Sequence, residues 1–219
     1  MNNQRFLLTT AAMLAFALPA AAASQSRDVS GFSGITLSAP IRVDLVLGDR
    51  ESVVLEGDDK AIAAIETSVE NGALHIRMKR DSKVFSWNVN GAEKVRVKIT
   101  AKKVSALNIN GSGDINAREL RADALAIGIA GSGDISIGGG KVGDLALQIS
   151  GSGDLGAGRL EVRRAVVSIT GSGDATVWAR ESLTVSVAGS GDVGYYGDPS
   201  LTRSVAGSGE IRRLGAAPA

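Results

Sequence analysis

The tetrapeptide Gly111-Ser112-Gly113-Asp114 decides the fold of this chain, because it returns at a nearly fixed interval through the C-terminal half. Further copies begin at Gly131, Gly151, Gly171, Gly189 and Gly207, and the last copy ends in Glu210 instead of Asp. The copies start 20 residues apart at first and 18 residues apart at the end. A regular period of this length is typical of solenoids, in which each repeat forms one coil and stacks on the next.

Aliphatic residues alternate with polar ones on both sides of every tetrapeptide. This period of two is typical of β-strands that turn one face inward. The residues two places before each first glycine are Ile109, Ile129, Ile149, Ile169, Val187 and Val205. The residues directly after each acid are Ile115, Ile135, Leu155, Ala175, Val193 and Ile211. Since equivalent positions hold equivalent residues, we expect an all-β, single-stranded parallel β-helix whose coils of about 20 residues stack in register.

The N-terminus has the pattern of a secretory signal. Residues 1–23 combine the basic Arg5, an apolar run and the small residues Ala21-Ala22-Ala23, and the apolar run is too short for a membrane span. We therefore expect a signal peptide over 1–23, no transmembrane segment, and a periplasmic or secreted bacterial protein. Residues 24–30 are predicted to be a polar leader.

We expect one β-helix domain over residues 31–214, because no Pro-rich or Ser-rich linker divides the chain. Its N-terminal part, 31–104, is irregular and could cap the helix, whereas 105–214 holds the regular repeats. Residues 215–219 are predicted to be a flexible tail. In the last repeat, Arg203 stands at an inward position, so we expect the final coil to be frayed or to act as a cap that discourages edge-to-edge pairing.

Local signals divide the irregular part. Asp58 or Asp59 is suited to cap a short helix through residues 61–66. The pair Asn71-Gly72 predicts a tight hairpin turn between two strands. Val95, Val97 and Ile99 alternate with polar residues and predict another strand.

Charge and composition narrow the function. The chain has 24 basic and 23 acidic residues, and removal of residues 1–23 takes away only Arg5, so the net charge falls to about zero and does not favour nucleic acid as a partner. Cysteine is absent, which excludes disulfide and thiolate chemistry. Aromatic residues make up only 4% of the chain, which argues against a large apolar ligand pocket.

The repeats resemble the head GIN domain, a bacterial family of unknown function described as the heads of auto-transporter adhesins. The tetrapeptides at 111–114, 131–134, 151–154, 171–174 and 189–192 carry the resemblance, and the segments 32–35 and 69–76 are similar too. The resemblance covers most of the chain. It implies a right-handed parallel β-helix and supplies no catalytic residues. We find no membrane-barrel translocator region in the sequence.

In-register stacking would place the acid of every tetrapeptide in one row: Asp114, Asp134, Asp154, Asp174, Asp192 and Glu210. Carboxylates ~4.8 Å apart repel each other by roughly 1 kcal/mol in water, so something must offset the repulsion. One interpretation is structural: the glycines take positive φ, and the Ser and Asp side chains accept hydrogen bonds from turn N–H groups. The other is a row of cation sites, with calcium as the candidate, or a polar strip that meets a glycan. No other cofactor is expected.

Other clusters are less specific. Lys79, Arg80, Lys83, Lys94, Arg96, Lys98, Lys102 and Lys103 form a local basic excess, which is either a solvated strand face or a site for an acidic envelope polymer. Phe85 and Trp87 could stack on a sugar or serve the core, and one residue of Tyr195-Tyr196 is expected to enter the core. His75, the only histidine, lies in a predicted strand without a nucleophile signature.

We therefore predict a non-enzymatic, exported β-helix protein with an adhesin-like or envelope-structural role. Its partner could be a glycan, an envelope protein or a second copy bound through the coil ends. The alternatives are a polysaccharide-active β-helix enzyme and a self-assembling envelope scaffold. The short, uniform intervals between tetrapeptides argue against the enzyme, because they leave no room for the long loops that wall a substrate cleft.

Overall fold

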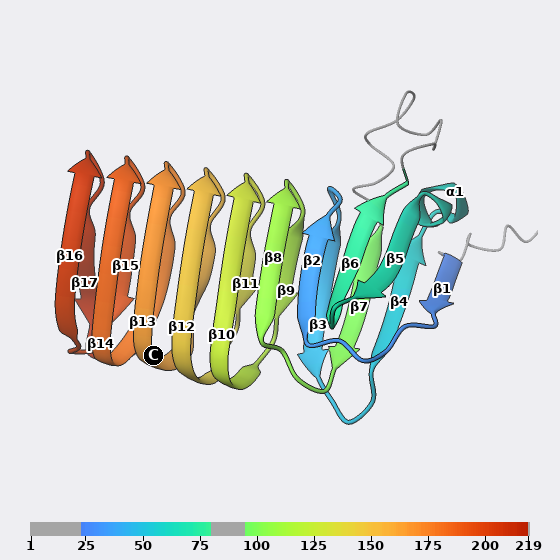
Figure 1. Ribbon diagram of the computed structural model, residues 1–219, viewed down its shortest axis with the longest axis horizontal. Coiled ribbons are helices and arrows are strands. Elements are labelled where there is room, and N and C mark those ends of the chain that lie inside the picture. Colours follow the sequence, from blue (N-terminus) through green and yellow to red (C-terminus); the bar gives the residue numbers. More distant parts are fainter. Residues whose placement is uncertain (1–22, 80–94, 219) are drawn as a thin grey trace, which may run out of the picture.

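Each coil of the repeat region consists of a front strand, a Gly-Ser-Gly-Asp turn and a shorter back strand (Figure 1). The computed structural model describes residues 23–79 and 95–218. The front strands of the repeat region are β8 (Ala106–Gly111), β10 (Leu120–Gly131), β12 (Gly140–Gly151) and β16 (Ser200–Gly207). The back strands are β9 (Asp114–Ala117), β11 (Ile135–Ile137), β15 (Val193–Tyr196) and β17 (Ile211–Gly215). Two long strands, β13 (Leu155–Gly171) and β14 (Ala175–Gly189), run from the back of one coil round to the front.

Neighbouring coils pair in parallel, and each residue lies beside its equivalent in the coil before. Ile129 of β10 stands between Ile109 of β8 and Ile149 of β12, for example. The stack continues to the last coil, where β16 pairs with β14 and β17 with β15. The predicted β-solenoid is therefore confirmed, with about six turns that wind to the right as expected (Figure 1).

Several stacked columns of aliphatic side chains fill the inside of the coils. Ile109, Ile129, Ile149 and Ile169 are each no more than 1% exposed, and the described part of the chain has no buried charged or polar residue. Burial of each such side chain contributes about 1.5–3 kcal/mol, so these stacked columns are the main source of stability.

The N-terminal coils do not stack in the order of the sequence. β2 (Gly34–Ser38) and β3 (Arg42–Leu47) form a coil that lies directly against β8 and β9. β6 (Ala73–Met78) and β7 (Arg96–Ala101) form the next coil outward, on the other side of β2 and β3. The chain must then cross the β2–β3 coil through residues 102–105 before the regular repeats begin.

The N-terminal end of the solenoid is closed by antiparallel strands and a helix. β4 (Ser52–Gly57) pairs with β7 on one side and with β1 (Ala23–Arg27) on the other. Four residues of the segment 24–30, expected to be only a polar leader, thus belong to a strand. Antiparallel strands end the parallel stack here, so this end has no free parallel edge.

The local signals of this region form the predicted structures. Asp58 caps helix α1 (Asp59–Ala63) by accepting hydrogen bonds from the N–H groups of Lys60 and Ala61, and the helix ends earlier than expected. β5 (Ile65–Glu70) pairs with β6 across the predicted turn, where Asn71 and Gly72 have φ values of 52° and 75°. In the described part of the chain, no helix is long and apolar enough to cross a bilayer.

The C-terminal end is open. β16 and β17 each pair with one neighbour in the described residues, and their inward side chains are incompletely covered. Val205 is 41% exposed, whereas the equivalent Val187 one coil earlier is 1% exposed. Arg203 is exposed beside Val185 and does not enter the core. β16 stays in register with β14 along its length, and β17 pairs with β15 with one register shift, so the last coil is an uncovered coil and not a frayed one.

Candidate functional site

The turns hold the acidic residues in one row along the upper edge of the solenoid. Asp134 accepts a hydrogen bond from the backbone N–H of Asp154 at 2.9 Å. Asp154, Asp174 and Asp192 each accept the same bond from the acidic residue one coil later, at 2.7 Å. This acidic ladder therefore links successive coils, and its carboxylates bond to the next turn and not to their own.

The two ends of the acidic ladder differ from its middle. Asp114, the first acid, faces Arg42 of β3, with 3.6 Å between guanidinium and carboxylate. Glu210, the last acid, donates its N–H to Asp192 and has no later coil to bond. Only the acid with no successor is Glu, which fits a requirement for the short Asp side chain wherever the carboxylate must reach the next turn.

The hydrogen-bond interpretation of the turns is correct in part. The first glycine of each tetrapeptide has positive φ, as in Gly131 and Gly151. The second glycine has no such φ, but a Cβ on Gly133 would collide with the backbone of Gly113, because the turns stack closely. No hydrogen bond from the serine hydroxyls of the tetrapeptides is found in the described residues. Glycine is thus required for φ at the first position and for close stacking at the second, and a Cβ at the first position of a stacked turn, as on Gly131, would also collide with the neighbouring backbone.

The acidic ladder forms no metal cage by itself. Within residues 23–79 and 95–218, no group of three or more His, Asp or Glu side chains converges as metal ligands do. The ladder carboxylates are placed one per coil, and one oxygen of each carboxylate from Asp134 to Asp192 already accepts an N–H. Calcium binding in this row stays a prediction.

Two described members of the expected basic excess are ion-paired. Arg96 lies 3.4 Å from Asp44, and Lys98 lies 2.8 Å from Glu56, both across neighbouring strands. Lys102 and Lys103 are exposed in the crossing segment, while Arg80, Lys83 and Lys94 lie outside the described residues. The paired members fit a solvated strand face better than a site for an acidic polymer.

Three aromatic residues, Trp178, Tyr195 and Tyr196, lie in the C-terminal coils. Tyr195 packs against the core, as expected for one residue of the pair. Tyr196 lies outside, where its ring passes close to Gly158 two coils earlier, and it is paired in register with Trp178. Trp178 was not singled out from the sequence. Phe85 and Trp87 lie outside the described residues.

His75 lies in β6 as predicted, half-buried beside Thr36 of β2 and Ser68 of β5. No charged side chain is recorded in contact with it. Its position on a paired strand gives no sign of a catalytic role.

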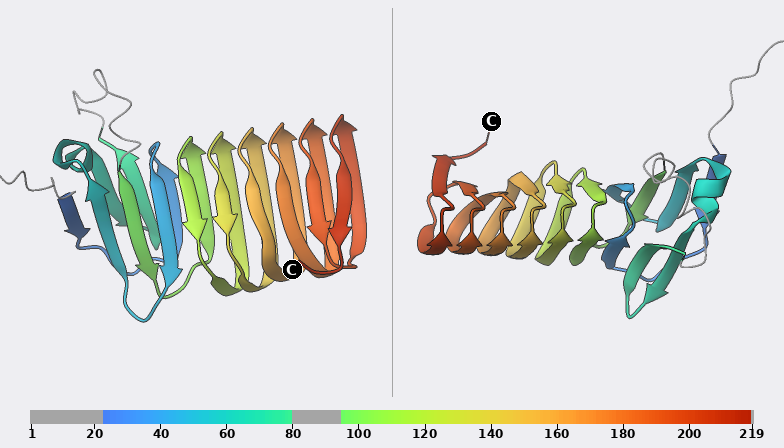
Figure 2. Two further views of the ribbon diagram at one scale, coloured as in Figure 1. Left: turned by 180° about the vertical axis from the view of Figure 1, so that it is seen from behind. Right: turned by 90° about the horizontal axis from the view of Figure 1, so that it is seen from above.

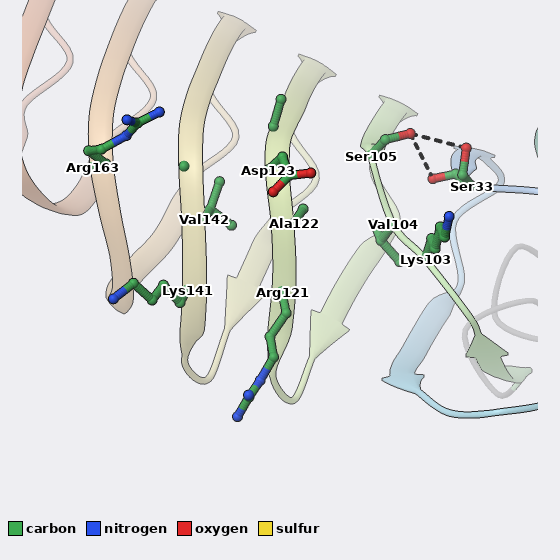
Figure 3. Close-up of a pocket in the computed structure, with 12 residues that line it drawn as sticks. Ser33, Lys103, Val104, Ser105, Arg121, Ala122, Asp123, Lys141, Val142 and Arg163 are labelled. Atoms are coloured by element: carbon green, nitrogen blue, oxygen red, sulfur yellow. Dashed lines mark hydrogen bonds between the residues drawn. The ribbon is translucent and has the colours of Figure 1, made fainter.

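A hollow of about 1020 Å³ opens at the lower corner, where the crossing segment diverges from β10 (Figure 3). Residues 120–124 of β10 pair with β12 only, because β8 begins at the level of Ala126. Val104, Ala122 and Val142 line the hollow, and Ser105 bonds to Ser33 beside it. Arg121 and Lys141 point away from Asp123 (Figure 3) and pair with Glu119 and Glu161. The corner is therefore an open notch in which Arg121, Lys141 and Arg163 are ion-paired.

The outward side chains of the front sheet form a surface without charge. Viewed from above, the front strands of the repeat region stand in a nearly straight row (Figure 2). Their outward residues nearest the turns, together with those of β2, are all uncharged, and we call this surface the uncharged face. It comprises Gly34, Thr36, Ser38, Ala106, Asn108, Asn110, Ala126, Gly128, Ala130, Ala146, Gln148, Ser150, Val166, Ser168, Thr170, Thr184, Ser186, Ala188, Thr202, Ser204 and Ala206.

The absence of charge on this face is not expected from composition. Charged residues make up 21% of the chain, so about four of these 21 positions would carry one if charges were spread evenly. Val166, at 54%, is the most exposed large aliphatic residue of the described chain. A shallow hollow of about 490 Å³ runs over Ala126, Ala146, Val166 and Thr184. The absence of charge at these outward positions is visible in the sequence, but the sequence-based prediction used only the inward positions.

Charges border the uncharged face on its long sides. The acidic ladder follows the upper side. Along the lower side, Arg164 binds both carboxylate oxygens of Asp144 at 2.7 and 2.9 Å, and Glu161 pairs with Lys141 and Arg180. The Arg164 hydrogen bond is the main cause that lowers the pKa of Asp144 below its ordinary value of 3.8. Beyond β2, Arg77 pairs with Glu66 at 3.2 Å and ends the face.

The family whose model matches residues 31–199 is described as "Putative auto-transporter adhesin, head GIN domain". The chain belongs to this family. The match includes the N-terminal coils and the repeats through the fifth tetrapeptide, which confirms the resemblance seen in the sequence. No curated protein matches the chain significantly.

Solved structures share the fold at low sequence identity. A "putative adhesin" from Bacteroides fragilis is 23% identical, with a TM-score of 0.71, and the match covers 89% of this chain and 98% of that one. A "putative adhesin" from Parabacteroides distasonis is 22% identical, with a TM-score of 0.57 and coverage of 88% and 97%. A "putative lipid binding protein" from the same species is 23% identical, with a TM-score of 0.53 and coverage of 90% and 98%.

Proposed function

We propose that this head GIN domain protein is exported to the bacterial cell envelope and acts there without catalysis, as an adhesin-like binding and structural protein. The observation that carries the proposal is the uncharged face, a flat row of small side chains on a rigid stack of strands. Depletion of charge is the mark of the central part of protein interfaces. The family description as an adhesin head supports the same role.

The arrangement of charges supports binding in preference to catalysis. Hollows in the described part of the chain are open and shallow, and the arginines and lysines nearest to them are mostly ion-paired. A polysaccharide-active enzyme needs unpaired acid and base groups in a walled cleft. Incubation with envelope polysaccharides should therefore release no new chain ends, and a steady release would overturn this part of the proposal.

The partner we propose is an uncharged envelope glycan or an envelope protein, bound through the uncharged face. Because no ion pair forms at such a surface, binding should change little between low and high salt. The test is binding of purified residues 24–219 to a glycan array and to isolated envelope fractions. Ser168→Arg, in the middle of the face, should abolish binding, whereas Ser136→Arg on the back strand β11 should not.

Calcium remains a separate proposal for the acidic ladder, which could recruit a cation between the free carboxylate oxygens of adjacent coils. Calorimetry with calcium should then give heat that is lost in an Asp134→Asn/Asp154→Asn double variant. Absence of heat, together with a melting temperature that calcium does not change, would remove it.

A further inference from the structure

The uncharged face has the size and shape to bury a second copy of itself. It spans seven neighbouring strands and three outward positions on each. With strands ~4.8 Å apart and residues ~3.3 Å apart, the face measures roughly 30 by 20 Å. Two such faces would bury about 1,200 Å², at the lower limit for specific protein interfaces.

We propose that the uncharged face pairs with the same face of a second copy, so that two solenoids lie sheet against sheet. This inference rests on the proposed function, because it names the partner of the same surface. Most side chains on the face are Gly, Ala, Ser or Thr, so two sheets can approach closely, as small-residue sheets do when they stack.

Other occupants fit the face less well. An ionic polymer would find no counter-charge on it. A glycan would bind the face through hydrogen bonds alone, because the face has no aromatic ring on which a sugar stacks. The open coil end is a weaker candidate for self-pairing, because Arg203 would be buried in the contact.

The charges at the borders select one arrangement of the pair. A two-fold axis that lies in the plane of the contact, perpendicular to the solenoid axis and parallel to the strands, would set the acidic ladder of one copy against the acidic ladder of the other. A two-fold axis parallel to the solenoid axis instead places each ladder along the lower border of the partner, where Lys141, Arg164 and Arg180 are paired with Asp144 and Glu161, so no row of like charges is faced. Like charges facing each other suppress an arrangement, so the second arrangement is favoured. In the favoured pair, every coil faces the same coil of the partner.

The natural absence of cysteine makes this arrangement testable by cross-linking. Single variants Asn108→Cys, Gln148→Cys and Ser204→Cys place one thiol on the face in the first, middle and last regular coils. A short bis-maleimide should cross-link all three variants into dimers. If the partner runs the other way, only Gln148→Cys, in the middle coil, should cross-link. Cross-linking of none of them overturns the proposal.

Sedimentation of the unmodified protein from micromolar to millimolar concentration measures the same contact independently. We expect a monomer–dimer equilibrium that Ser168→Arg weakens at least tenfold, since the two new charges would meet near the axis, and that Ser136→Arg leaves unchanged. Thr170→Arg repeats the test if Ser168→Arg fails to fold by circular dichroism. A dimer that all face variants leave intact, or a monomer at every concentration, contradicts self-pairing.

These outcomes separate self-pairing from the proposed function. A monomer that still binds envelope material, and loses that binding in Ser168→Arg, would leave the proposed function standing and remove the second copy as partner. A dimer that binds no envelope material would do the reverse.

Discussion

At the scale of single residues, the first glycine of a tetrapeptide is required for its φ and, where a similar turn lies beside it, also for close stacking. Gly151 has a φ of 136°, which L-residues rarely adopt, and a Cβ there would also collide with the backbone of Gly131. Gly111 has a similar φ of 127°, but open space surrounds its missing Cβ, since the preceding coil is β2–β3 and has no such turn. Comparison of Gly111 with Gly151 therefore separates the energetic cost of the backbone conformation from the energetic cost of close stacking.

Gly111→Ala should lower the free energy of unfolding by about 1–3 kcal/mol, the usual cost of a strained φ. Gly151→Ala should cost clearly more, because the Gly131 carbonyl must also move and the ladder around it must shift. Urea unfolding followed by circular dichroism measures both. Equal losses in the two variants would contradict the stacking argument.

Asp154 has two opposing effects on stability. Its carboxylate accepts the N–H of Asp174 at 2.7 Å, and it also repels the carboxylates of the coils on either side. Asp154→Ala removes the acceptor and should destabilise by about 1 kcal/mol. Asp154→Asn keeps a carbonyl oxygen as acceptor and removes repulsion of roughly 1 kcal/mol per neighbour in water, so it should be neutral or stabilising. The melting temperatures of the two variants, compared with the parent, test this expectation. A destabilised Asn variant would show that the negative charge itself is needed.

At the scale of elements, ion pairs tie the lower corner of β12 to that of β13. Asp144 and Arg164 are in register on these strands. Their bidentate contact links two successive coils at the lower corner, as the hydrogen bonds from backbone N–H groups to the Asp carboxylates do at the upper turns. A similar contact between Arg77 and Glu66 ties β6 to β5, and the Arg77 hydrogen bond lowers the pKa of Glu66 below 4.5.

The free energy of unfolding should therefore fall in acid, because these ion pairs lose their negative charge. A carboxylate whose pKa is lower in the folded than in the unfolded state stabilises the fold above its unfolded pKa, and this contribution is lost as the pH falls through the folded pKa. For Asp144 the loss should begin near its ordinary value of 3.8 and continue below it. Unfolding free energies from pH 7 to pH 2.5 should decline less steeply in Asp144→Asn. Parallel curves for variant and parent would show that the exposed pair contributes nothing.

The open strand β16 is protected by charge. Arg203 occupies the inward column beside Val185, and Arg213 folds back to Asp198 and the carbonyl of Gly197. We expect Arg203→Val to expose an apolar strand edge and to cause association through the coil ends. Sedimentation in a Ser168→Arg background, which removes pairing through the uncharged face, should then show growth with concentration. An unchanged monomer would mean that Arg203 is not what keeps this end free.

At the scale of the whole molecule, the repeat region is a one-dimensional stack. Each coil contacts the coil before and the coil after it, so its stability is a sum of similar coil terms. The N-terminal coils are different, because β2 and β3 are held between β6–β7 and β8–β9, which both follow them in the sequence.

Deletion of residues 131–150 tests the stack. It removes one coil and joins Ala130 to Gly151, so that every column is restored one coil shorter. The variant should fold with the same β-sheet spectrum and a denaturant m-value lower by roughly a tenth, in proportion to the surface that unfolding exposes. Deletion of residues 131–140, half a coil, removes one turn and breaks the columns, and it should not fold. Failure of the full-coil deletion would mean that the repeats are not equivalent.

The sequence by itself determined the regular coils. Gly-Ser-Gly-Asp returns at a period of 20 and then 18 residues, with Ile or Val two places before it. Such a chain buries its aliphatic face by stacking equivalent residues of successive coils. Local chemistry also determined the Asp58 cap and the Asn71-Gly72 turn, because both depend on residues close in sequence.

Only the tertiary structure decided the order of the N-terminal coils, since parallel pairing of β2 with both β6 and β8 involves segments far apart in the chain and leaves no local signal. It also decided what the acidic residues do, because a carboxylate that bonds the next coil is recognisable only when the coils are stacked. The uncharged face lies between these cases. Its residues are readable in the sequence, but they become a surface only when parallel strands bring outward positions 18 to 20 residues apart side by side.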